Sequence, residues 1–153
     1  VRRIAGGTFH HVAHSLLREH SQLLGYGERY TLLDREDAQD LMGKCISELD
    51  LAVGARRFPR AEVMLDLVST AMNTQKPLAD VLGEKRPQFL PIVDDVLRVA
   101  SRFVVRKQEM QVMDFDDLLM NWKVLLAEHP DVRRRLQERF KAILVDEYQD
   151  TNR

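Results

Sequence analysis

Apolar residues recur along most of this chain at intervals of three and four, which places them on one face of an α-helix. Between them stand mostly charged and polar residues, as expected for helices that bury one face and expose the other. A short helix is expected near Leu78 to Leu82. Six main helices are predicted: Phe9 to Leu24, Ala38 to Leu49, Ala61 to Thr74, Ile92 to Lys107, Phe115 to Leu126, and Val132 to Phe140.

Acidic residues mark the starts of two of these helices. Asp34 and Asp114 each precede a helical stretch whose first turn carries further acids, which is the arrangement of an N-cap residue. Asp116 and Asp117 follow Asp114 directly. We therefore interpret this acidic trio as helix capping and packing against a larger parent domain rather than as a cation site.

Extended structure is predicted at only a few places. Ala142 to Val145 is a run of four consecutive apolar residues, which favours a buried strand of a parallel sheet. Arg3 to Thr8 is a weaker strand candidate, because Gly6 and Gly7 are poor strand formers. Tyr30 to Leu33 could form a short extended piece.

The predicted elements indicate how the chain is organised. One strand at each end with about six helices between them is an unusual complete fold, because two lone strands cannot make a stable parallel sheet. We therefore expect a mostly α chain, in which a helical unit is inserted in a larger α/β domain and only short flanking strands of that domain are present. Residues 1–8 and 141–153 would belong to the α/β domain, and residues 9–140 would form the helical unit.

The composition narrows the class of protein. The chain has 153 residues, of which 44% are hydrophobic and 31% charged, as in a globular domain. Its net charge of −1 means that nucleic-acid binding would need a local basic patch. No apolar run approaches the roughly 18 residues of a membrane span, and no signal peptide is apparent, so we expect no membrane partner. The single cysteine, Cys45, is expected in the core and fits a cytoplasmic protein.

The last ten residues are the strongest candidate for chemistry. The predicted strand ends in two adjacent carboxylates, Asp146 and Glu147, and Asp150 follows three residues later. Open α/β sheets bind ligands at the carboxyl ends of their strands, where one acid can hold Mg²⁺ and its neighbour can orient a water. An Asp-Glu pair alone is common at exposed turns, so it is weak evidence for a site. The full string Asp146 to Asn152 is a far more specific motif than the pair.

Three stretches resemble motifs of one helicase family. Leu144 to Arg153 resembles motif II of the UvrD/Rep/PcrA family of superfamily 1A DNA helicases. Gly7 to His10 (Gly-Thr-Phe-His) resembles the short family motif that follows the first DNA-contacting motif, and Met113 to Leu119 resembles the family's Asp-Phe-Asp-Asp-Leu segment. The resemblance implies that residues 9–140 are helical subdomain 1B. This subdomain is inserted in the P-loop, RecA-like domain 1A, to which residues 1–8 and 141–153 belong.

The resemblance also implies roles for the acidic end and for the first helix. Asp146 would hold the Mg²⁺ of bound ATP, Glu147 would polarise the attacking water, and Gln149 and Asp150 would complete the nucleotide-binding motif. The DNA candidates at the other end, which would lie near the single-stranded DNA path, are Thr8, Phe9 and His10. A Phe suits stacking on bases, and Thr and His suit phosphate contacts.

The phosphate-binding loop of ATP-hydrolysing helicases, Gly-x-x-x-x-Gly-Lys-Ser/Thr, does not occur in this sequence. We therefore expect that the chain alone hydrolyses no ATP. The resemblance implies an intact enzyme that couples ATP hydrolysis to movement along single-stranded DNA, 3′-to-5′, and to unwinding at junctions with duplex DNA, in repair or replication. Its partners would be DNA, ATP and the rest of the helicase chain.

A basic ridge is the other DNA candidate. Arg98, Arg102 and Arg106 step by four along one predicted helix, with Lys107 beside them and no acid in between. Such a ridge is often only a solvated helix face, and the alternative is a contact to DNA phosphates.

Two alternatives to the helicase interpretation stay open. One is a helicase–nuclease subunit of the RecB/AddA type, which shares these motifs. The other is a non-enzymatic helical interaction module with a chance acidic end.

Overall fold

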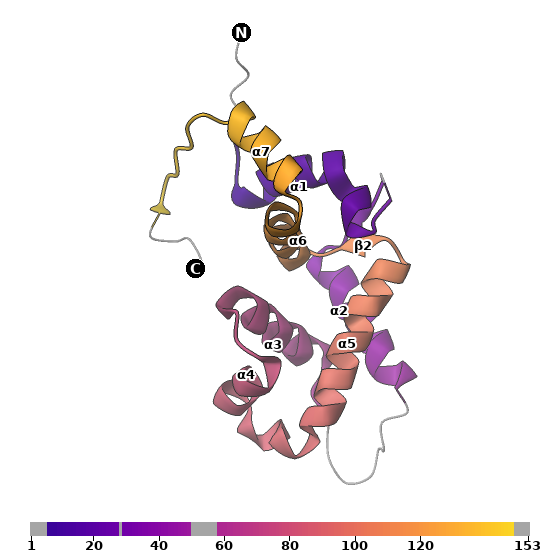
Figure 1. Cartoon of the computed structure of the whole chain (residues 1–153). Helices are drawn as coiled ribbons and strands as arrows, with labels where there is room; N and C mark the ends of the chain where they lie inside the picture. Colours follow the sequence, from indigo (N-terminus) through magenta and orange to yellow (C-terminus); the bar gives the residue numbers. More distant parts are fainter. Residues whose placement is uncertain (1–5, 28, 50–57, 149–153) are drawn as a thin grey trace.

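The computed structural model describes residues 6–27, 29–49 and 58–148, and this part of the chain is mostly helical (Figure 1). Its order is α1 (Phe9–His20), the 3-10 turn η1 (Ser21–Leu24), β1 (Thr31–Leu32), α2 (Arg35–Glu48), α3 (Ala61–Thr74), α4 (Leu78–Lys85), the 3-10 turn η2 (Pro87–Ile92), α5 (Val93–Glu109), β2 (Val112–Met113), α6 (Phe115–Glu128) and α7 (Pro130–Arg139). All six predicted main helices and the short one are confirmed. None of the helices in the described ranges is long and apolar enough to cross a membrane.

The helix starts follow from local chemistry. Asp34 accepts a hydrogen bond from the Asp37 backbone N–H through Oδ1, at 2.8 Å, and so caps α2. Asp114 caps α6 in the same way, with Asp117 as its partner at 2.9 Å. Both predicted N-caps are thus confirmed. Helix α7 begins at Pro130, where the missing N–H costs nothing because a first-turn N–H has no partner in the helix.

The buried side chains form two hydrophobic clusters. The α5 cluster lies among α2, α3, α4 and α5 and is centred on large side chains such as Met42, Leu67 and Phe103. The α6 cluster lies among α1, α6 and α7, with Leu17 and Leu125 at its centre. Figure 1 shows the two sets of helices at opposite ends of the molecule.

A two-residue parallel ladder stands between the clusters. Thr31 pairs with Val112 and Leu32 with Met113, so the predicted extended piece at 30–33 is confirmed. Successive side chains of a strand point to opposite faces. Val112 accordingly joins the α5 cluster and Met113 the α6 cluster. The strand Val112–Met113 was not predicted, because two apolar residues are too few to show an alternating pattern.

The predicted strand at Ala142 to Val145 is wrong for this chain. Residues 142–145 have no regular structure, and the side chains of Ile143 and Leu144 are 79% and 98% exposed. The segment leaves α7 and runs clear of the helices (Figure 1). A strand needs a neighbour for its backbone hydrogen bonds, and no segment in the described ranges pairs with it. The weaker candidate, Arg3 to Thr8, has no strand at residues 6–8, and its remainder lies outside the described residues.

Two predicted core assignments on α5 are also wrong. Leu97 and Val104 follow Val93 and Ala100 by four residues, and this apolar spacing predicts that they face inward, but they are 38% and 53% exposed. Helix α5 is rotated so that Val99 and Phe103 occupy the centre of its buried face. Cys45 is fully buried, as predicted, and burial raises the pKa of its thiol.

Candidate functional site

Two segments far apart in the sequence meet at the starts of α1 and α6. Helix α1 packs along α6, so their first turns lie together at one edge of the molecule. The His10 imidazole meets the Phe115 ring edge-on, with the ring centroids 5.7 Å apart and the planes at 77°. The structure therefore brings together the Gly7–His10 segment and the 113–119 segment, the first of which is a predicted DNA-contact site.

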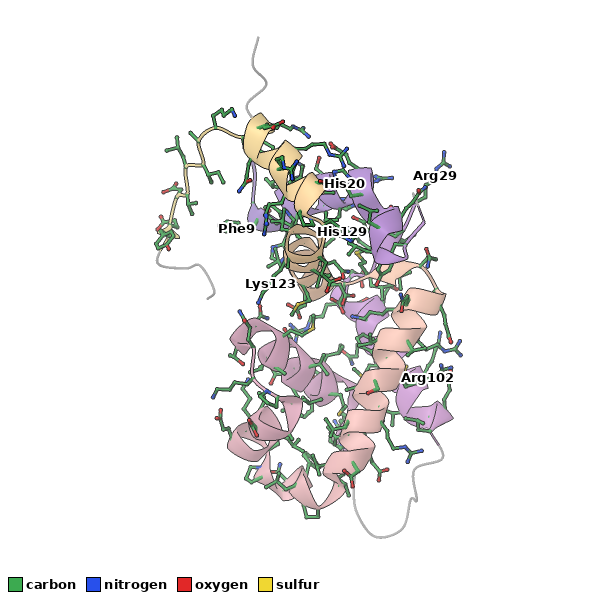
Figure 2. The ribbon with its side chains drawn as sticks, in the orientation of Figure 1. Phe9, His20, Arg29, Arg102, Lys123 and His129 are labelled. Carbon is green, nitrogen blue, oxygen red and sulfur yellow. The ribbon has the colours of Figure 1, made fainter. Side chains whose placement is uncertain are left out.

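Both phenylalanines at this edge are unusually exposed. Phe9 is 48% exposed and extends outward from the start of α1 (Figure 2), and Phe115 is 53% exposed. The apolar spacing of Phe115, Leu118 and Leu119 predicts that Phe115 faces inward, but it stands in the first turn of α6, where the core no longer covers that face. Exposed aromatic faces are what base stacking requires. We call Thr8, Phe9, His10 and Phe115 the α1–α6 surface.

Thr8 and Gly7 shape the start of α1. The Thr8 hydroxyl oxygen accepts a hydrogen bond from the His11 backbone N–H at 3.2 Å, so Thr8 is the N-cap. Its hydroxyl proton stays able to donate, for example to a phosphate oxygen. Gly7 has φ +150°, and a Cβ added there would lie 2.8 Å from Cδ2 of His11. The glycine in this segment is therefore required by both conformation and space.

The start of α6 is held by a buried ammonium that was not predicted. Lys107 was expected beside the exposed ridge, but its side chain is only 2% exposed. Its Nζ lies 2.6 Å from Oδ2 of Asp114 and 2.6 Å from Oδ2 of Asp117. Asp116 accepts a hydrogen bond from the side-chain amide of Asn73, on α3, at 3.1 Å. The predicted capping role is confirmed for Asp114 and Asp117, and packing against the parent domain stays a prediction.

The predicted arginine ridge lies on one face of α5, but it is paired with acids. Arg98 contacts Asp95 at 3.0 Å. Arg102, labelled in Figure 2, contacts Glu48 of α2 at 3.0 Å and Glu109 at 3.4 Å. Arg106 is ion-paired with the same two acids.

These ion pairs change the electrostatics of the ridge. Hydrogen bonds from Arg106 and Arg102 lower the pKa of Glu48. The expectation of a one-sided basic ridge is therefore corrected: Glu48 is distant in sequence, and only the fold brings it to the arginines. A DNA contact by Arg98, Arg102 and Arg106 stays a prediction.

The acidic pair at the end of the described chain is exposed. The Glu147 backbone N–H donates to Oδ1 of Asp146 at 3.0 Å, and Glu147 has φ +48°. Gln149 and Asp150 lie outside the described residues. An exposed carboxylate such as Asp146 suits Mg²⁺, which is commonly held by one or two carboxylates together with phosphate oxygens and waters. Among the described residues, no group of three or more His, Cys, Asp or Glu side chains is placed to hold a metal ion by itself.

Comparison with known proteins gives a match over the whole chain. Residues 1–153 match the family described as UvrD/REP helicase N-terminal domain. The sequence is 32% identical over 151 residues to the ATP-dependent DNA helicase PcrA of Leuconostoc citreum, which covers 99% of this chain and 19% of that protein. It is 29% identical over 151 residues to DNA helicase II of Escherichia coli, covering 95% of this chain and 19% of that protein.

The chain thus spans about a fifth of the length of the curated relatives that it matches. A match that extends over all of the helices argues against an unrelated helical module with a chance acidic end.

Proposed function

The chain belongs to the UvrD/REP helicase N-terminal domain family, and we propose that it is the part of an ATP-dependent DNA helicase that contacts single-stranded DNA through the α1–α6 surface. The observation that carries the proposal is the meeting of Gly7–His10 with the start of α6, which leaves Phe9 and Phe115 exposed. Residues 9–140 would form subdomain 1B, and residues 1–8 and 141–153 would belong to RecA-like domain 1A.

The α1–α6 surface offers the two kinds of contact that single-stranded DNA needs. The exposed rings can stack on bases, which every base sequence allows. The Thr8 hydroxyl and the backbone N–H groups of the first turn of α1 can donate to a phosphate, at the end of the helix where the helix dipole favours negative charge. This combination favours binding without base specificity, as translocation along DNA requires.

The acidic end would serve ATP hydrolysis in the whole protein. Asp146 would hold the Mg²⁺ of bound ATP, which would neutralise charge developing on the phosphates. Glu147 would orient the attacking water, and Gln149 and Asp150 would complete the motif. Because the sequence has no phosphate-binding loop, the chain alone would hydrolyse no ATP. Hydrolysis in the whole protein would drive translocation, 3′-to-5′, and unwinding during DNA repair or replication.

Phe9→Ala is expected to weaken binding of a single-stranded oligonucleotide to the chain about tenfold, because one stacked base contributes roughly 1–3 kcal/mol. Fluorescence anisotropy of a labelled oligonucleotide measures the dissociation constant. Leu23→Ala is the matched control, because Leu23 is also 48% exposed but lies in η1. An equal loss in both variants, or no loss in Phe9→Ala, would remove Phe9 from the DNA-contact surface.

A further inference from the structure

Lys107 connects the two halves of the molecule from a buried position. It belongs to α5, where it lies four residues after Phe103 of the α5 cluster, and its Nζ sits 4.5 Å from the centre of the Phe103 ring. Its two carboxylate partners belong to the start of α6, which packs into the α6 cluster. One ammonium therefore links the two clusters, as the two-residue ladder also does through Val112 and Met113.

The partners of Lys107 are the two carboxylates that define the first turn of α6. Asp114 accepts from the Asp117 backbone N–H at 2.9 Å, and Asp117 accepts from the Asp114 backbone N–H at 3.0 Å, which is a reciprocal capping box. Asp114 uses Oδ1 for the cap and places Oδ2 2.6 Å from Nζ, whereas Oδ2 of Asp117 serves the cap and also lies 2.6 Å from Nζ. The ammonium thus fixes both ends of the capping box at once.

Lys107, Asp114 and Asp117 bring one positive and two negative groups together in a buried site. Burial lowers the pKa of Lys107, but Asp117 and Asp114 raise it more, so that the pKa lies above its usual range and the ammonium stays charged. Burial also raises the pKa of Asp117, and the like charge of Asp114 adds to this effect. Without the Lys107 ammonium, two negative charges would be left buried side by side, so the position of both carboxylates depends on it.

Phe115 lies between the two carboxylates in the sequence and is the first residue of α6. Its ring is the one that meets His10 at 5.7 Å and contributes exposed aromatic surface. The two hydrogen bonds of the capping box run between Asp114 and Asp117 and so enclose Phe115. Whatever holds the box in place therefore also holds the backbone of Phe115. Lys107 itself is 2% exposed, so it does not belong to the α1–α6 surface.

We propose that Lys107 is a positioning residue for DNA binding: its buried ammonium, shared by Asp114 and Asp117, sets the first turn of α6 and thereby places Phe115 against His10 on the α1–α6 surface. Its role in DNA affinity rests on the proposed function, whereas its effect on the His10–Phe115 contact does not. A conventional core residue would contribute to stability without controlling this contact.

The test uses two variants, because Lys107→Met alone could fail to fold and would then give no information on the His10–Phe115 contact. Lys107→Met leaves two buried carboxylates without their cation. The triple variant Lys107→Met, Asp114→Asn, Asp117→Asn leaves no buried charge, and Asn is as good an N-cap as Asp. Leu82→Ala is the control, because Leu82 is fully buried in the α5 cluster and belongs to α4, away from α6.

The first readout is the ring-current shift that Phe115 imposes on the His10 imidazole protons, measured by NMR without DNA. We expect this shift to be lost in the triple variant and in any folded Lys107→Met, and kept in Leu82→Ala. A triple variant that folds and keeps the shift of the unaltered chain overturns the positioning role.

The second readout is the dissociation constant for a single-stranded oligonucleotide, which we expect to rise about five- to tenfold in the triple variant, as for the loss of about one stacked base. If the unaltered chain binds no oligonucleotide, the proposed function fails while the His10 shift still decides the role of Lys107. An unchanged affinity in a triple variant that has lost the shift would overturn the link to DNA binding.

Discussion

Under the proposed function, Glu147→Gln in the full-length protein is expected to lower DNA-stimulated ATP turnover by about 10²- to 10⁴-fold, the usual contribution of a group that accepts a proton from the reacting water. The amide has the size of the carboxylate but does not polarise water in the same way. The exposed position of Glu147, beside the magnesium candidate Asp146, leaves its carboxylate accessible to a bound nucleotide.

Nucleotide and DNA binding separate this role from a structural one. Affinity for ATP and for single-stranded DNA should change little in Glu147→Gln, because the altered group is needed only as the water attacks. Glu138→Gln is the matched control, because Glu138 is exposed on α7 and no role is proposed for it. Turnover that stays within twofold of the unaltered enzyme would mean that another residue orients the water.

Lys107→Met is expected to lower the free energy of unfolding of the chain by about 3–5 kcal/mol, the usual cost of removing one partner from a buried ion pair. The methionine side chain can fill the space, but the carboxylates of Asp114 and Asp117 then lack their cation. Urea unfolding followed by circular dichroism measures the loss. A change below about 1 kcal/mol would show that the two acids are neutral or solvated in the folded chain.

The pH dependence of stability provides an independent check of the same ion pairs. The pKa of Lys107 is raised in the folded chain, so its contribution is fully present below its unfolded value of 10.5 and is lost as the pH rises through the folded value. The stability of the unaltered chain should therefore fall in this alkaline range. In Lys107→Met the free energy of unfolding should not show the part of this alkaline decrease that comes from Lys107.

Local patterns were sufficient to predict the helices. The Asp34 and Asp114 caps act through hydrogen bonds to backbone groups three residues away, so a short window of sequence contains both partners. Helix α3 has the predicted ends, Ala61 and Thr74. The strand predicted at Ala142 to Val145 is wrong because the apolar run says nothing about the neighbouring strand that must hydrogen-bond to it.

The candidate site depends on contacts that the sequence does not display. Asp95 and Glu109 pair with arginines three residues away on α5 itself, whereas Glu48 belongs to α2, so its ion pairs with Arg102 and Arg106 could not be read from the charge pattern. Lys107 looked like a member of the arginine ridge, although its position four residues after the buried Phe103 points to the inner face of α5. The contact of His10 with Phe115 joins two segments that resemble separate motifs, and only the packing of α1 on α6 creates it.

The proposed function requires that the surface formed by the starts of α1 and α6 binds single-stranded DNA, and NMR titration of the chain with a short oligonucleotide measures this binding residue by residue. We expect shift changes concentrated at Thr8, Phe9, His10 and Phe115, with an affinity that falls as salt rises. Shift changes confined to the face of α5 that carries Arg102, or none at saturating oligonucleotide, would contradict it.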